Sequence, residues 1–150
     1  MKHELYVICD NLRSLYNVGS IFRTSDALGV AKIFLCGITG TPLQKGVLKV
    51  SLGAENSVPW EHHKHAWRVI ENLRKRGIQI ISLELGAKSI DIKQLKSKFP
   101  CALVVGNEIN GVSRALLKRS DIIVKIPMHG IKESMNVAVA YGIAAYSILS

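Results

Sequence analysis

The chain has 150 residues, the size of one ordinary domain, and we expect residues 1–150 to fold as a single unit. Hydrophobic residues make up 48% of the sequence and charged residues 21%, which excludes an intrinsically disordered chain. The 20 Lys and Arg residues exceed the 11 Asp and Glu residues, and the resulting formal charge of +9 favours a polyanionic partner such as RNA, DNA or acidic lipid.

Short runs rich in β-branched residues alternate with helical patterns along the chain. The predicted strands are Leu5–Cys9, Lys32–Cys36, Ile78–Leu83, Ala102–Val105 and Ile122–Ile126. The predicted helices are Asn17–Leu28, His65–Arg76, Ser113–Arg119 and Ser134–Leu149. This alternation predicts an α/β fold with a mostly parallel sheet and helices on both faces. Ligands of such sheets usually bind outside the carboxyl ends of the strands, so candidate site residues are sought there.

Several classes of protein are disfavoured by simple patterns. The cysteines Cys9, Cys36 and Cys101 are far apart and adjoin apolar runs, which predicts buried reduced thiols and neither a disulfide framework nor a zinc site. The histidines near residue 62 lack a matched second ligand pair, so no metal is expected. No signal peptide is recognisable, and the apolar stretch 135–149 is too short to cross a bilayer. We therefore expect a cytoplasmic protein that is not bound to a membrane.

The first segment of chemical interest, residues 10–24, follows the first predicted strand. We expect Asn17 to cap the helix and Arg23 to project from the side opposite its apolar face. Gly19 lies one turn before Arg23 and lacks a side chain, so a ligand could approach the backbone beside the guanidinium group. By itself this pattern also fits an ordinary solvated helix.

Two further segments lie where predicted strands give way to helices. In residues 102–113, two glycines frame Asn107 and Glu108, a spacing that matches neither dinucleotide-binding nor triphosphate-binding loops. A simple turn would not require a carboxylate at Glu108. The last helix is apolar nearly all round, which predicts burial within the fold or in a subunit interface. Ser134 is its expected N-cap, and Asn136 is expected to be a buried amide with a hydrogen-bond partner.

Taken together and in this order, the segments resemble the SPOUT class of methyltransferases. The resemblance is greatest to the SpoU (TrmH-like) branch, which methylates ribose 2′-hydroxyls in tRNA or rRNA. The matching stretches are Asn17-x-Gly-Ser-Ile-x-Arg23-Thr, Lys49-Val-Ser-Leu-Gly-Ala-Glu55, Gly106-Asn-Glu108 with Gly111, and Ile126-Pro-Met-x-Gly130 through Ser134-x-Asn136-Val. They cover most of the chain. Ile109 departs from the family pattern, because many relatives have glycine there, and this departure could alter the path of the loop.

The resemblance implies features that the periodicities alone do not predict. It implies a C-terminal trefoil knot, a homodimer, and S-adenosylmethionine as the cofactor, with no metal. Its catalytic positions fall on Arg23, Asn17, Glu108, Ser134 and Asn136. Its cofactor-binding positions fall on Leu83, Gly106, Ile126, Met128, Ser134 and Met135. The expected contacts with tRNA or rRNA are Arg13, Arg23, Lys45 and Lys49.

The expected activity is S-adenosylmethionine-dependent methylation of a ribose 2′-hydroxyl in RNA. Arg23 is a poor general base, because guanidinium keeps its proton above pH ~12, so it is assigned a forked grip on RNA phosphate. Glu108 and Asn136 are expected to organise the cofactor loops and not to transfer protons. Two alternatives remain open: a knotted dimer that binds RNA without catalysis, and a SPOUT enzyme that methylates a base nitrogen.

Overall fold

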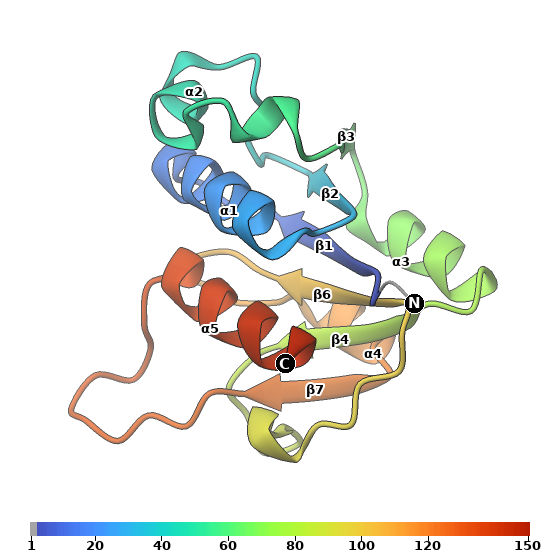
Figure 1. Ribbon diagram of the computed structural model, residues 1–150. Coiled ribbons are helices and arrows are strands. Elements are labelled where there is room, and N and C mark those ends of the chain that lie inside the picture. The colour runs from blue at the N-terminus through green and yellow to red at the C-terminus, as the bar shows by residue number, and fades with distance from the viewer. Residues whose placement is uncertain (1–2) are drawn as a thin grey trace.

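A computed structural model describes residues 3–150, and its centre is a seven-stranded sheet in which all paired strands are parallel (Figure 1). The strand order across the sheet is β3-β2-β1-β6-β4-β7-β5. The strands are β1 (Leu5–Asp10), β2 (Lys32–Cys36), β3 (Trp60–His63), β4 (Gln79–Leu83), β5 (Ile90–Asp91), β6 (Cys101–Val105) and β7 (Ile122–Lys125). The predicted α/β class and parallel sheet are confirmed, whereas the edge strands β3 and β5 were not predicted.

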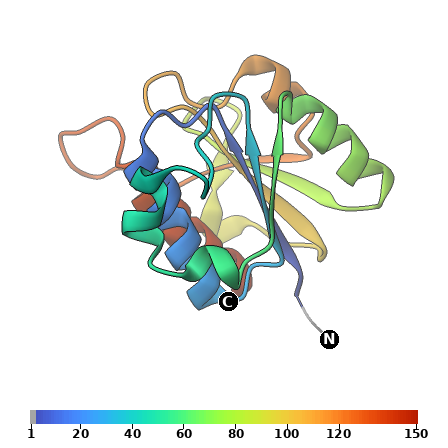
Figure 2. The same ribbon diagram turned by 90° about the horizontal axis from the view of Figure 1, so that it is seen from above.

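Helices cover both faces of the sheet, as predicted. They are α1 (Leu15–Leu28), α2 (Lys45–Ser51), α3 (Ala66–Lys75), α4 (Arg114–Lys118) and α5 (Val137–Leu149), with short 3₁₀ turns η1 (Ala54–Asn56) and η2 (Ile92–Gln94). Seen from above, α1, α2 and α5 lie on one side of the sheet and α3 and α4 on the other (Figure 2). Within residues 3–150, none of the helices combines the length and the apolar composition needed to cross a membrane.

Each helical layer buries its own apolar core against the sheet. Successive residues of β1 alternate between the two cores, because side chains of a strand point to opposite faces. Leu5 and Val7 face α1 and α5, while Tyr6 and Ile8 face α3. The three cysteines lie in these cores as free, buried thiols, which confirms the sequence-based expectation.

Gly19 allows α1 to pack closely against α2. A Cβ atom at this position would lie 2.6 Å from the carbonyl oxygen of Val47 and 2.7 Å from the Cβ of Val50. The expected approach of a ligand at Gly19 is therefore wrong. The reason is that α2, which was not predicted, covers this part of α1.

Two helices begin at different residues from those predicted. Ser14, and not Asn17, caps α1, since its Oγ accepts a hydrogen bond from the Asn17 backbone N–H at 3.1 Å. Asn136, and not Ser134, caps α5 by accepting from the backbone N–H groups of Ala138 at 2.8 Å and Val139 at 3.1 Å. In both segments more than one polar residue could serve as the cap, and the pattern alone does not choose among them.

Only one side of α5 is buried in the single chain. Tyr141 is fully buried, and its hydroxyl shares a 2.6 Å hydrogen bond with the Ser25 hydroxyl of α1. On the other side, Val139, Ile143 and Tyr146 are 55%, 45% and 67% exposed. Of the two expected environments for α5, complete burial within the fold is therefore excluded, and the uncovered side remains available to a second molecule.

Replacing Gly19 by Ala should destabilise the protein, although alanine favours a helix over glycine by about 1 kcal/mol. The added methyl group would overlap the backbone of α2, and overpacking of this kind costs about 1–3 kcal/mol. Urea unfolding at a fixed protein concentration measures the change. Gly86→Ala, in the loop after β4, is the matched control, since nothing lies within 4 Å of a Cβ atom there. Equal stability of the two variants would contradict the packing role of Gly19.

Candidate functional site

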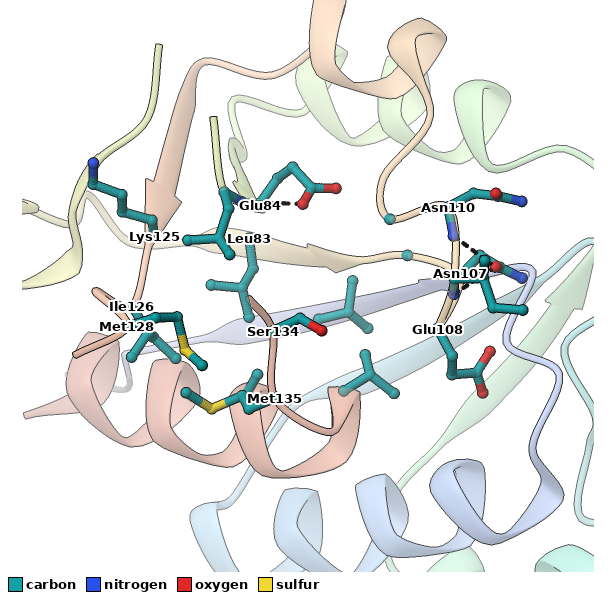
Figure 3. A pocket seen from close by; sticks show the side chains of 17 residues that line it. Leu83, Glu84, Asn107, Glu108, Asn110, Lys125, Ile126, Met128, Ser134 and Met135 are labelled. Atoms are coloured by element: carbon teal, nitrogen blue, oxygen red, sulfur yellow. Dashed lines mark hydrogen bonds between the residues drawn. The ribbon is translucent and has the colours of Figure 1, made fainter. Parts of the chain in front are cut away.

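A pocket lies at the carboxyl ends of β4, β6 and β7, where three segments converge (Figure 3). One segment follows β4, the second follows β6, and the third runs from the end of β7 into α5. Figure 3 shows the apolar side chains of Ile126, Met128 and Met135 gathered at one end of the pocket and Glu108 at the other. The pocket therefore offers an apolar surface beside polar groups, as sites for small organic ligands do.

The loop after β6 turns so tightly that two of its residues must be glycine. A Cβ atom on Gly106 would lie 2.4 Å from the carbonyl group of Gly111, and Gly111 itself has a φ of +70°. Asn107 holds the turn, because its Oδ1 accepts from the backbone N–H groups of Ile109 at 2.9 Å and Asn110 at 3.0 Å. Ile109 does not need a positive φ, so its departure from the family pattern leaves this turn intact.

Glu108 binds the start of α1. Its Oε1 accepts a hydrogen bond from the backbone N–H of Arg13 at 2.8 Å, and its Oε2 accepts from the backbone N–H of Ser14 at 2.9 Å. Burial raises the pKa of this carboxyl group, but these hydrogen bonds outweigh it, so the pKa lies below its usual value. The fixed negative charge also suits the positive end of the helix dipole. Glu108 is therefore ionised at neutral pH and acts as an anchor.

Two amide side chains extend this contact to α5. Asn17 donates through Nδ2 to Glu108 Oε2 at 3.1 Å, and Asn136 donates through Nδ2 to Asn17 Oδ1 at 3.1 Å. Asn136 in turn caps α5 through its Oδ1. The residue is exposed, contrary to expectation, yet its amide has the expected partner. A continuous chain of hydrogen bonds thus joins the loop after β6, α1 and α5.

The structure brings most of the predicted site residues together, but Arg23 lies apart from them. Asn17, Glu108 and Asn136 form the network just described, and Ser134 lines the pocket. The predicted cofactor positions all line the same pocket: Leu83, Gly106, Ile126, Met128, Ser134 and Met135. Arg23 is exposed on α1 and does not line this pocket in the single chain. The predicted RNA contacts at Arg13, Lys45 and Lys49 are also exposed.

Glu84 lines the pocket as well, and sequence reasoning missed it. Its Oε2 accepts from the backbone N–H of Val112 at 2.7 Å, and its Oε1 accepts from the backbone N–H of Leu85 at 3.0 Å. The carboxylate therefore ties the end of β4 to the loop after β6. One feature of the sequence could have pointed to Glu84. It is an acidic residue immediately after an apolar strand, and the end of that strand at Leu83 was predicted correctly.

The segment 127–135 leads from β7 to α5, and Met128, Ser134 and Met135 of this segment line the pocket. In Figure 1 it swings away from the sheet before the chain returns to α5. Among residues 3–150, no backbone hydrogen bond involves residues 127–135. The peptide groups of Met128, Ser134 and Met135 are thus free to bind a ligand. Nowhere in residues 3–150 do three or more His, Cys, Asp or Glu side chains gather as metal ligands.

Comparison with known proteins identifies the family. The sequence model of the SpoU rRNA Methylase family matches residues 4–146. The chain belongs to the SpoU rRNA methylase family. Its pocket and its Glu108 network therefore lie within the residues that the SpoU family model matches.

Individual SpoU relatives match almost the whole chain. The putative TrmH family tRNA/rRNA methyltransferase YacO of Bacillus subtilis is 32% identical over 98% of this chain and 59% of its own length. The tRNA (guanosine(18)-2′-O)-methyltransferase of Aquifex aeolicus is 32% identical over 97% of this chain and 68% of its own length. A crystal structure of an AdoMet-bound rRNA methyltransferase from Sinorhizobium meliloti superposes with a TM-score of 0.92 and 30% identity, covering 99% of this chain and 56% of that one. The chain thus spans between half and seven-tenths of the length of these SpoU relatives.

Glu108→Gln should destabilise the SpoU domain by about 1–3 kcal/mol at pH 7, because the amide group cannot accept all three hydrogen bonds. The Glu108 contribution is complete above the usual Glu pKa of 4.5 and is lost as the pH falls through the lowered folded-state value. Urea unfolding between pH 7 and pH 3 should therefore show the two proteins converging in acid. Glu133→Gln, on the exposed loop, is the matched control. A difference that stays constant with pH would contradict this role of the Glu108 charge.

Proposed function

We propose that this protein is an S-adenosylmethionine-dependent methyltransferase that acts on a ribose 2′-hydroxyl of tRNA or rRNA. The observation that carries the proposal is the pocket at the carboxyl ends of β4, β6 and β7, which contains every predicted cofactor position. Membership of the SpoU family and the description of the Sinorhizobium meliloti relative as AdoMet-bound support it. The description of the Aquifex aeolicus relative as a 2′-O-methyltransferase favours ribose over a base nitrogen.

The pocket fits S-adenosylmethionine in its chemistry. Leu83, Ile126 and Met135 offer apolar surface for a flat adenine ring, and the unpaired peptide groups of Met128, Ser134 and Met135 offer hydrogen bonds. The residues that would hold the cofactor are Leu83, Gly106, Ile126, Met128, Ser134 and Met135. When bound, the cofactor supplies an activated methyl group, so the protein has mainly to position the acceptor oxygen.

Arg23 is assigned to the RNA. Its guanidinium group stays protonated and presents paired N–H donors, which suit an RNA phosphate and stabilise negative charge developing on the 2′-oxygen. Lys45 and Lys49 lie on α2 and Arg13 lies just before α1, and all three are exposed. They therefore extend the positive surface available to the RNA backbone. In this scheme Glu108 and Asn136 hold the loops and helices in place and do not transfer protons.

We also propose that two copies pair through α1 and α5. A groove between these helices is lined by Tyr16, Ser20, Thr24, Asn136, Ala138, Val139, Gly142 and Ile143. Large apolar side chains stand exposed along it, which is costly for an isolated chain and is relieved in an interface. Such a pair would complete the site if Arg23 of one protomer faced the pocket of its partner.

The C-terminal trefoil knot and a cytoplasmic location belong to the same proposal. After β7, which pairs with β4, the chain passes the pocket and returns to pack α5 against β6 and α1. This path supports a threaded C-terminus.

A cytoplasmic location is supported by the free, buried thiols and suits an enzyme that modifies tRNA or rRNA.

The test is methylation of RNA in vitro. The purified protein should transfer labelled methyl groups from S-adenosylmethionine to total RNA from a deletion strain. Digestion to nucleosides should place the label on ribose. A label on a base would favour the base-nitrogen alternative, and RNA binding without cofactor binding would favour the non-catalytic one.

Arg23→Ala and Arg23→Lys should both slow methyl transfer by on the order of a hundredfold, since neither side chain supplies the fork of N–H donors. Binding of S-adenosylmethionine, measured by titration calorimetry, should be unchanged because Arg23 does not line the pocket. Arg76→Ala is the matched control, since Arg76 lies between the end of α3 and the start of β4, at the amino edge of the sheet. A near-normal rate for Arg23→Lys would contradict the forked grip.

Ile143→Glu should convert the protein from dimer to monomer, because it places a charge in the apolar groove between α1 and α5. Light scattering coupled to size-exclusion chromatography gives the mass of each species. Leu43→Glu is the matched control: Leu43 is 85% exposed and lies outside the groove. A monomeric wild-type protein, or an Ile143→Glu protein that remains dimeric, would refute this interface.

A further inference from the structure

We propose that the carboxylate of Glu84 recognises the two ribose hydroxyls of the adenosine part of the methyl donor. This inference rests on the proposed function and assigns a specificity role to a residue that the family motifs do not include. The inference follows from the number of hydrogen bonds that each carboxylate oxygen at the pocket already accepts within the protein.

Two carboxylates line the pocket, Glu84 and Glu108, and they differ in what their oxygens already bind. Glu108 accepts three hydrogen bonds from the start of α1, two of them on Oε2. Glu84 accepts only one on each oxygen, from Leu85 and Val112. A carboxylate oxygen can accept two, so Glu84 keeps one acceptor position on each oxygen. Of the two carboxylates, Glu84 is thus the one with a free acceptor position on each of its oxygens.

The Glu84 carboxylate is held rigidly in place. Its two backbone donors come from different segments, Leu85 after β4 and Val112 after β6, so rotation of the side chain would break at least one of the bonds. Gly111 makes room for it: a Cβ atom there would lie 1.9 Å from Glu84 Oε2. An acceptor fixed in this way loses little conformational entropy when it binds a ligand.

A vicinal diol is the partner that this geometry suits. Two adjacent hydroxyl groups can each donate to one carboxylate oxygen, as an acidic residue near the strand ends does for ribose in dinucleotide-binding folds. The other polar side chains fit less well. Lys125 can only donate, and Asn107 already accepts two hydrogen bonds through Oδ1. Asn110 and Ser134 each carry a single side-chain oxygen, so neither presents a pair of acceptors. Leu83, the neighbour of Glu84, offers the apolar contact that an attached base requires.

The test compares ligands with and without the hydroxyl groups. Titration calorimetry would measure S-adenosylhomocysteine and its 2′-deoxy and 3′-deoxy analogues against wild-type, Glu84→Gln and Glu4→Gln proteins. Glu4 is an exposed acidic residue just before β1, at the opposite edge of the sheet from the pocket, and serves as the matched control. Thermal unfolding of each variant confirms that it is folded.

Wild-type and Glu4→Gln proteins should bind each deoxy analogue roughly tenfold to a hundredfold more weakly than S-adenosylhomocysteine, as expected for the loss of a hydrogen bond to a charged group. In Glu84→Gln this discrimination should shrink to about threefold or less. Such a loss marks direct recognition, because a residue that only held the loop would weaken all three ligands by one common factor.

Retained discrimination in Glu84→Gln, or no discrimination in the wild type, would overturn this inference and leave the proposed function standing. A wild-type protein that binds neither S-adenosylhomocysteine nor S-adenosylmethionine would overturn both.

Discussion

The site depends on one charge-assisted anchor, the hydrogen bonds between the Glu108 carboxylate and the two backbone N–H groups immediately before α1. Three segments that are far apart in the chain meet there, since residues 13 and 108 are 95 positions apart. The loop that carries Glu108 forms a pocket wall, and Asn17 and Asn136 transmit the contact to the start of α5. A few hydrogen bonds thus fix the positions of the pocket, α1 with its Arg23, and α5 relative to one another.

Much of the fold could be predicted from sequence because its central strands are strongly apolar and two of its longer helices, α1 and α3, end at glycines. Gly29 and Gly77 both adopt the left-handed backbone expected just after a helix. The edge strands escaped prediction for a physical reason: β3 is Trp-Glu-His-His, a half-exposed strand without an apolar run, and β5 has only two residues. Helix α2 is also short, and its stability comes from packing against Gly19 of α1.

The sequence predicted those residues of the candidate site that belong to short motifs. Motif resemblance named residues of the pocket wall, and the structure gathers them in one place. It did not give the partners of Glu108 or Asn17, because those bonds join positions that are close only in the folded chain. Glu84 was missed for the same reason, since an acidic residue after a strand becomes informative only when the loop it binds is known.

The order of the strands has a consequence for how the protein is made. Strand β6 lies between β1 and β4, yet it follows both in the chain. During synthesis on the ribosome, β1 and β4 therefore each expose an unpaired edge until residue 105 has emerged, and such edges are prone to aggregation. The two halves of the sheet cannot join until this central strand has emerged, and β5 joins the sheet only through β7, which emerges later still. Because so many contacts are distant in sequence, assembly should be slow compared with that of a helical protein of the same length.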